Sequence, residues 1–462
     1  MSSPYPEAFQ TSATEAGLLP EETQTLWRIC NGLEGYSLYE DLRANSAALV
    51  TNYPNYVQFE SERGTAVDGR PIGVATVWGE DNEGASAYLQ GPEHALEKIG
   101  SDTVAALMQL FAHHRTILRR FGYKKLVGCD HIDPVGDRLQ EWGPKLPVDL
   151  PEFAYGAWRG KWRDQVSWGY PTPTYHEISP ENKLSLELLR ENPDFFGSLH
   201  GATFGSYAVV SHNHQELVNN LSGLLNSSGL ALNYDQPEAP GTLIYAPAVF
   251  STINKEQFDE RRVLPEEPVN DDGGTNAVDV VGQNTTVLIP EIAWVESAAG
   301  NAPSSSTYLE AINIRAEMIR TTVEYITRTL DILSPWIENN LGLLTVHRLH
   351  GAAAWYRDMI PGVVEAQVEA ARDDTKAHLL LTNAERAQVV GVFGTEALVY
   401  AGNARRLAQM ANNLALQEDL TYHIHREAEV IGPIRTVPVA KQVAVQALLV
   451  LAGMRHAGTV GS

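Results

Sequence analysis

The sequence predicts an α+β fold that is mainly α-helical, with a long spine helix at about residues 307–334, a helical C-terminal half and a smaller β-containing middle. Two observations at the spine helix carry this prediction. Thr307 and Glu310 form a T-x-x-E capping box, in which each side chain bonds a free backbone N–H of the first turn. Apolar residues follow at alternating spacings of three and four, which places them on one helical face: Leu309, Ile312, Ala316, Ile319, Val323, Ile326, Leu330 and Leu333.

The spine helix is expected to end at Ser334, because Pro335 disfavours helical geometry in the residue before it. Its apolar face is narrow, and oppositely charged residues such as Glu317 and Arg320 flank that face at helical spacing. A face this narrow suits packing against one or two partner helices. We therefore expect this helix to be the spine of a helical plate.

Shifts in composition divide the chain into three regions. Residues 1–258 mix helix, strand and loop, residues 259–306 form an acidic loop with short strands and a linker, and residues 307–462 are helical. A chain of 462 residues can bury a large core. We expect one compact plate with these regions as subdomains.

In the first region, apolar periodicity predicts helices over 18–49, 101–121, 179–190 and 212–225, and strands over 70–78 and 202–210. Residues 242–253 and 278–295 hold the β-branched runs of the middle. Ser179 before Pro180 is an N-cap followed by a proline in the first helical turn.

In the helical region, Thr382 and Glu385 form a second capping box, and Pro361 is expected to begin a helix. Three glycines fall inside the pattern that follows, where each costs about 1 kcal/mol relative to alanine. They predict a close helix approach or a kink: Gly391, Gly394 and Gly402.

Charge and cysteine content exclude several functional classes. The formal net charge of −23 argues against unaided binding to nucleic acid or to an anionic membrane. The most apolar stretch, residues 443–453, is too short to span a bilayer. Two cysteines, Cys30 and Cys129, provide no disulfide framework and fit a reducing compartment.

No catalytic, cofactor or metal motif stands out, so the sequence predicts no catalytic residue, no cofactor and no metal site. His347 and His350 would share a helical face, but no carboxylate or third histidine follows them at a ligand spacing. The motifs H-E-x-x-H, G-x-S-x-G and the phosphate-binding glycine loops are absent.

A cluster of aromatic and cationic residues in the segment 155–170 is the one candidate contact surface. Aromatic rings can stack on unpaired bases while cations meet phosphate, and tryptophan and arginine also anchor protein–protein contacts. The candidate RNA or interface contacts are Trp158, Arg159, Lys161, Trp162, Arg163 and Trp168. Packing in the core is the alternative for the tryptophans.

In overall character the chain resembles the capsid proteins of small double-stranded RNA viruses of the totivirus and partitivirus kind. The resemblance rests on the long helix at 307–334, the smaller β portion and the ordered loops rich in proline, glycine and tryptophan. It implies a structural protein without enzymatic activity, in a virion or the host cytoplasm. Its partners would be many copies of itself, with viral RNA and a polymerase inside the shell and no membrane.

Three alternatives remain at this point. A bacteriophage major capsid protein has a similar character. A soluble helical enzyme would place its site in a cleft between the N-terminal region and the C-terminal helices, with His347, His350 or the segment around Trp158 as first candidates. An interaction scaffold is the third.

Overall fold

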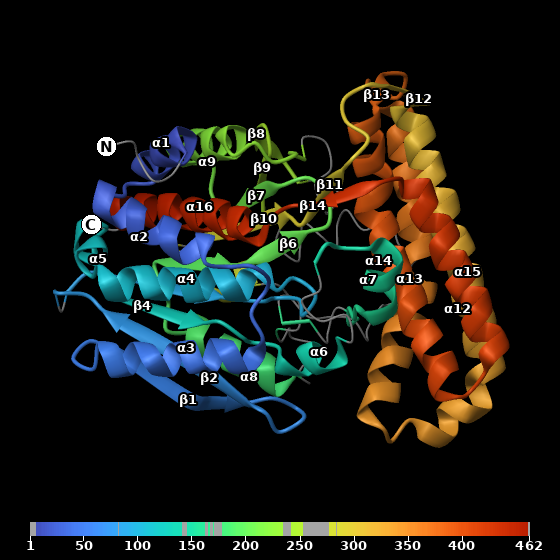
Figure 1. Ribbon diagram of the computed structural model, residues 1–462, viewed down its shortest axis with the longest axis horizontal. Helices are drawn as coiled ribbons and strands as arrows, with labels where there is room; N and C mark the ends of the chain where they lie inside the picture. The colour runs from blue at the N-terminus through green and yellow to red at the C-terminus, as the bar shows by residue number, and fades with distance from the viewer. Residues whose placement is uncertain are drawn as a thin grey trace.

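A ten-stranded mixed sheet forms the centre of the first two thirds of the chain (Figure 1). The computed structural model describes residues 6–81, 83–140, 146–161, 165–166, 170, 178–233, 242–252, 277–282 and 284–460. The strands are β1 (Val57–Thr65), β2 (Pro71–Trp78), β3 (Ala85–Gln90), β4 (Tyr123–Cys129), β5 (Phe195–Ser198), β6 (His200–Ala202), β7 (Tyr207–Val210), β8 (Ile244–Ala246), β9 (Val249–Ser251) and β10 (Thr286–Ala293). Their order is β1-β2-β4-β3-β5-β10-β7-β9-β8, and β6 also pairs with β10.

Four neighbouring strands at the centre of the sheet, β4, β3, β5 and β10, run parallel. Helices cover this part of the sheet, so its strands are buried and lack the alternating pattern of a half-exposed strand. That burial explains why β3, β4 and β5 were not predicted. The strand predicted over 70–78 is present as β2, and the segment 202–210 forms the end of β6 and all of β7.

A row of helices packs along one face of the sheet: α3 (Tyr39–Asn52), α4 (Ile99–His113), α16 (Val439–Val460) and α9 (Gln215–Ser227) (Figure 1). The remaining helices of this part are α1 (Glu7–Glu15), α2 (Pro20–Asn31), α5 (Thr116–Arg120), α6 (Pro134–Leu139), α7 (Leu150–Gly156), α8 (Pro180–Leu189) and α11 (Ala277–Val280). Ser179 caps α8 as predicted, because its side chain accepts a hydrogen bond from Asn182 N.

A bundle of four long helices stands beside the sheet (Figure 1). It consists of α12 (Tyr308–Asn340), α13 (Leu344–Asp373), α14 (Asn383–Met410) and α15 (Leu414–Ile431). Two short antiparallel pairs accompany it, β11 (Val295–Ser297) with β14 (Ile434–Thr436) and β12 (Pro303–Thr307) with β13 (Leu380–Thr382). The chain therefore leaves the sheet after β10, builds the bundle, and returns through α16, which packs on β10.

The fold class, α+β and mainly helical with a long helix in the C-terminal half, is confirmed. Both capping boxes are present: Glu310 N donates to Thr307 Oγ1 at 3.3 Å, and Glu385 N donates to Thr382 Oγ1 at 3.2 Å. The β region extends further than the predicted middle, since its strands begin at Val57. Within the described residues, no helix combines the length and apolarity needed to cross a bilayer.

Two predicted helix boundaries in the bundle are wrong. Pro335 lies inside α12, and Pro361 lies inside α13 instead of beginning a helix. A proline inside a helix costs about 3 kcal/mol, but Leu333 and Ile337 on either side of Pro335 are buried against the bundle. Burying such side chains stabilises the continuous helix by a comparable amount, so packing outweighs the local preference.

Gly402 on α14 should be intolerant of a side chain, because a Cβ there would lie 1.7 Å from the carbonyl oxygen of Ala154 on α7. We expect Gly402→Ala to lower the free energy of unfolding by about 1–3 kcal/mol in urea denaturation. Gly351 on α13 is the matched control, since nothing lies within 4 Å of its Cβ position. Gly351→Ala should be neutral or slightly stabilising, and equal losses in both variants would contradict the close approach.

Buried Asp102, on α4, should give the fold a pH dependence. Its carboxylate accepts hydrogen bonds from Ser37 N at 3.2 and 3.3 Å, yet burial raises its pKa from 3.8 to about 7. The folded chain keeps this proton to a higher pH than the unfolded chain, so stability falls as pH rises from about 4 to about 7. In urea denaturation we expect Asp102→Asn to raise the free energy of unfolding by on the order of 2 kcal/mol at about pH 8.5 and to leave it unchanged at about pH 4.

Candidate functional site

A buried cluster of two histidines and two carboxylates lies where the parallel strands end. His94 and Glu97 lie in the loop between β3 and α4, His200 lies on β6, and Glu291 lies on β10. In open α/β sheets, ligands bind at the carboxyl ends of parallel strands. The fold therefore gathers these four side chains at the edge where a site is expected.

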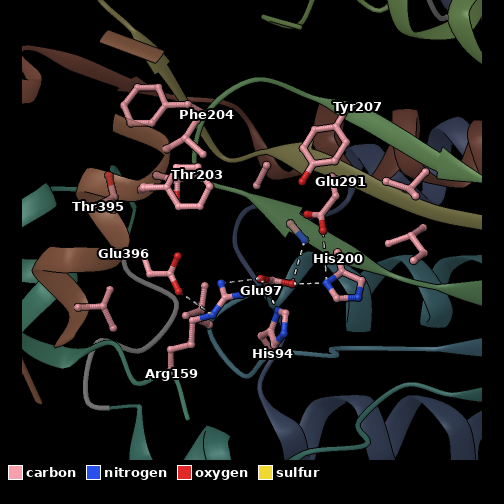
Figure 2. A pocket seen from close by; sticks show the side chains of 18 of the residues that line it. His94, Glu97, Arg159, His200, Thr203, Phe204, Tyr207, Glu291, Thr395 and Glu396 are labelled. Carbon is pink, nitrogen blue, oxygen red and sulfur yellow. Dashed lines mark hydrogen bonds and ion pairs between the residues drawn. The ribbon is translucent and has the colours of Figure 1, made fainter. Parts of the chain in front are cut away.

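Strand register places three of the polar side chains in a row. Glu291 pairs with His200 on β6 and with Tyr207 on β7, so the three residues lie side by side on adjacent strands. Figure 2 shows the Tyr207 hydroxyl pointing toward the Glu291 carboxylate. Gln446 of α16 donates to the carbonyl oxygens of His200 at 2.6 Å and Pro290 at 2.9 Å, which ties the two strands together beneath the site.

A close backbone approach brings the loop of His94 and Glu97 to the strand of His200. A Cβ on Gly100 would lie 2.4 Å from the carbonyl oxygen of Leu199, so only glycine fits there. The first turn of α4 can thus contact the junction of β5 and β6 directly.

Glu97 is the centre of the cluster (Figure 2). Its Oε1 lies 2.7 Å from His94 Nδ1, and its Oε2 lies 3.1 Å from His200 Nδ1. His200 Nδ1 is also 3.4 Å from Glu291 Oε1. The residues His94, Glu97 and His200 are only 6%, 3% and 5% exposed, so this is a desolvated arrangement of charge.

Hydrogen bonding shows that Nε2 of His200 carries a hydrogen. Ser198 Oγ donates its only hydrogen to Glu93 Oε1 at 2.6 Å, so at its 3.2 Å contact with His200 Nε2 it accepts. Nε2 therefore carries a hydrogen, and Nδ1 faces Glu97 and Glu291 without forming a hydrogen bond of good geometry. Gly201 N donates to Glu97 Oε2 at 3.2 Å and holds that carboxylate in place.

The electrostatics of the cluster favour a cation at its centre. Burial lowers the pKa of His94 to about 4, although Glu97 opposes the shift. Burial acts in the same direction on His200, but Glu291 and Glu97 outweigh it and raise the pKa to about 10. Burial opposes ionisation of Glu97, yet the two imidazoles hold its pKa well below the usual range. The carboxylates thus hold a proton on His200 where a metal ion would fit.

His94, Glu97 and His200 match the donor set of a zinc site. One potential ligand atom from each residue lies within 4.8 Å of the others. Two imidazoles with one carboxylate, plus a position left open, is a ligand set of catalytic zinc. The Ser198 contact with His200 Nε2 is the outer-shell hydrogen bond that ligating histidines make. The buried Nδ1 of His200, which faces Glu97 and Glu291 without a hydrogen bond of good geometry, supports the fit.

Arg159 is the cationic neighbour of this cluster. Its Nη1 lies 3.6 Å from Glu97 Oε1, and its Nε lies 3.4 Å from Glu396 Oε1 on α14. The Gln140 side chain holds the preceding residue by accepting from Trp158 N at 3.0 Å and donating to Trp158 O at 2.9 Å. Arg159 therefore bridges the cluster and the helical bundle.

The other candidate contacts named from the sequence fall in different places. Trp158 is buried and Lys161 is half-buried. Trp162, Arg163 and Trp168 lie outside the described residues. For these six residues, contact with RNA or with a partner protein stays a prediction. His347 and His350, the other candidates, do not line the cavity described next.

A cavity of about 260 Å³ opens from the cluster toward the bundle. The sheet edge contributes the histidines and carboxylates together with Phe204, and α13 and α14 contribute the opposite wall. Figure 2 shows Thr395 and Glu396 of α14 on one side and His94, Glu97 and His200 on the other. The site therefore lies between the two parts of the fold.

Sequence reasoning missed His94, Glu97, His200 and Glu291. His94 and Glu97 are the only H-x-x-E in the chain, which is a metal-ligand spacing that a search for H-E-x-x-H and E-x-x-H leaves out. Its position just after a strand and before a helix is the signal that could have found it. His200 and Glu291 have no local signal, because only the strand register brings them to the cluster.

No protein-family model matches the sequence, and no curated protein is significantly similar to it. Among solved structures, the carboxypeptidase A of Helicoverpa armigera is similar over 55% of this chain and 64% of its own, with 12% identity and a TM-score of 0.36. A metallo-carboxypeptidase of Pseudomonas aeruginosa is similar over 53% of this chain and 58% of its own, with 16% identity and a TM-score of 0.31. This chain thus spans less than two thirds of either enzyme.

These findings correct the sequence-based assignment. The predictions of a viral or phage capsid protein, and of a chain without enzymatic activity, are wrong. The core holds a buried group of metal-ligand type, His94, Glu97 and His200, and this group lines a cavity between the sheet and the bundle. The findings favour the alternative of an enzyme with its cleft between the N-terminal region and the C-terminal helices.

We expect the purified protein to retain about one equivalent of zinc after dialysis, measured by elemental analysis. His94→Gln and His200→Asn should each weaken zinc binding by more than the roughly 10–100-fold that outer-shell changes cost. His347→Gln is the matched control, because His347 is exposed on α13 and outside the cluster. Full zinc content in both cluster variants would show that the cluster holds no metal.

Proposed function

We propose that this chain is a zinc-dependent hydrolase that cleaves an amide bond in the cavity between the sheet and the bundle. The single observation that carries the proposal is the buried group of His94, Glu97 and His200 with Glu291 beside it. Three protein ligands with an adjacent carboxylate that is not part of the ligand set is the arrangement of a catalytic rather than a structural metal site.

His94 Nδ1, Glu97 and His200 Nδ1 would hold the metal. When bound there, zinc would supply Lewis acidity to a water and to a substrate carbonyl. Ser198 and Gly201 keep the ligands oriented through their contacts with His200 and Glu97, so little reorganisation is needed on binding.

Glu291 is the candidate general base. Its Oε1 lies 3.4 Å from His200 Nδ1, so its carboxylate borders the ligand set. In hydrolysis, the water oxygen bonds to the carbonyl carbon, the C–N bond breaks, and a proton moves from the water to the leaving nitrogen. Glu291 accepts that proton and returns it to the nitrogen, which is the role of a positioned carboxylate with access to both.

Arg159 is the candidate for stabilising the charge that develops on the carbonyl oxygen. Its guanidinium lies 3.6 Å from the Glu97 carboxylate, at the edge of the ligand set. A fixed positive group in a water-poor site stabilises a developing oxyanion more strongly than water does. A carbonyl substrate would therefore meet a base on one side and a cation on the other.

Blocked dipeptides are simple amide substrates for this test. On them we expect Glu291→Gln to lower kcat by about 10²–10⁴-fold while the zinc content stays at one equivalent. The side chain keeps its size, so the loss would report proton transfer and not folding. Glu369→Gln on α13 is the control, because Glu369 is exposed and pairs only with Arg372 among the contacts described. Wild-type turnover in Glu291→Gln would remove Glu291 from the mechanism.

A further inference from the structure

The wall of the cavity that faces the cluster belongs to the helical bundle. On α13, the lining residues Tyr356, Ile360, Val363, Val364 and Gln367 follow one helical face at spacings of three, four and one. Several of them are only half-buried although they lie inside the fold, because they border the cavity instead of a packed neighbour.

The second helix of the wall is α14. Val392, Phe393, Glu396 and Val399 line the cavity from that helix. Glu396 is connected to the cluster through Arg159, because its carboxylate pairs with that residue and Arg159 in turn lies beside Glu97. Apart from Gln367 and Thr395, the bundle side of the cavity is therefore mostly apolar, and its carboxylate lies at the end that meets the polar site.

An apolar cavity wall of this kind lowers the stability of the fold unless a group fills the cavity. Side chains that border empty space lose the van der Waals contacts they would make in a packed core, and a larger cavity costs more stability. Apolar cavities do not retain ordered water, since water needs two or more polar partners. An apolar group of a ligand would restore the missing van der Waals contacts and would need no polar partners.

We propose that the bundle forms a specificity subsite that binds a bulky apolar group, aliphatic or aromatic, carried by the substrate next to the carbonyl that the cluster attacks. The inference rests on the proposed function for the position of that carbonyl. The subsite consists of Ile360, Val363, Val364, Val392 and Phe393. The sheet edge performs the chemistry, and the bundle selects the substrate.

The chain offers a matched pair of residues to test this subsite. Val364 and Val368 lie one turn apart on α13 and are 2% and 4% exposed. Val364 lines the cavity, whereas Val368 does not. Replacing either by alanine removes the same atoms from the same helix, so a difference between the two variants reports the cavity alone.

The probes are alkyl hydroxamates, from acetohydroxamate to hexanohydroxamate, titrated calorimetrically into the zinc-loaded protein. Each added methylene should tighten binding by roughly fourfold. Val364→Ala should weaken hexanohydroxamate by about three- to tenfold and leave acetohydroxamate unchanged, and Val368→Ala should change neither. Val364→Phe, which fills the subsite, should remove the dependence on chain length.

A second series separates the subsite from the metal. Acetamide and hexanamide, which lack a chelating group, are titrated into zinc-free protein by saturation-transfer NMR. Hexanamide should bind, acetamide should not, and Val364→Ala should weaken hexanamide. If zinc and acetohydroxamate fail to bind while this result holds, the proposed hydrolase is wrong and the subsite stands. Affinity independent of chain length in both series, or equal effects of the two alanine variants, would overturn the subsite.

Discussion

The carboxylate of Glu97 is the contact on which the site depends. It lies 2.7 Å from one imidazole, 3.1 Å from the other and 3.6 Å from the Arg159 guanidinium. Burying a carboxylate is costly unless positive charge and hydrogen bonds surround it. Because Glu93 and Glu291 are buried nearby, the available cations are shared among several acids. That imbalance gives a divalent cation a strong electrostatic reason to bind.

Segments that are far apart in the chain bring together the residues around the Glu97 carboxylate. A strand-to-helix loop supplies His94 and Glu97, and paired strands supply His200 and Glu291. Gln446, which arrives with the last helix after the whole bundle, donates to the carbonyls of His200 and Pro290. Because its amide satisfies two buried carbonyl groups at once, it fixes the spacing of the strands that carry His200 and Glu291.

Local chemistry could be predicted from the sequence, and nonlocal packing could not. Each capping box, at Thr307 and at Thr382, involves two residues three positions apart, so both could be predicted from the sequence and both are present. The helix boundaries predicted at Pro335 and Pro361 are wrong, because burial of neighbouring side chains in the bundle outweighs the free-energy cost of a proline inside a helix. The site follows the same division. The pair His94 and Glu97 is visible as a spacing, but the register that adds His200 and Glu291 depends on a parallel sheet whose strands lack an alternating pattern.

The bundle is joined to the site by contacts at two levels. At the backbone, Gly402 allows α14 to approach the carbonyl of Ala154, at the start of the segment that leads to Arg159. At the side chains, Glu396 on the same helix pairs with Arg159. A shift of α14 would therefore change the position of the guanidinium and the shape of the apolar wall together. Because one helix sets both, a ligand that packs against α14 would also stabilise the position of the Arg159 guanidinium beside Glu97.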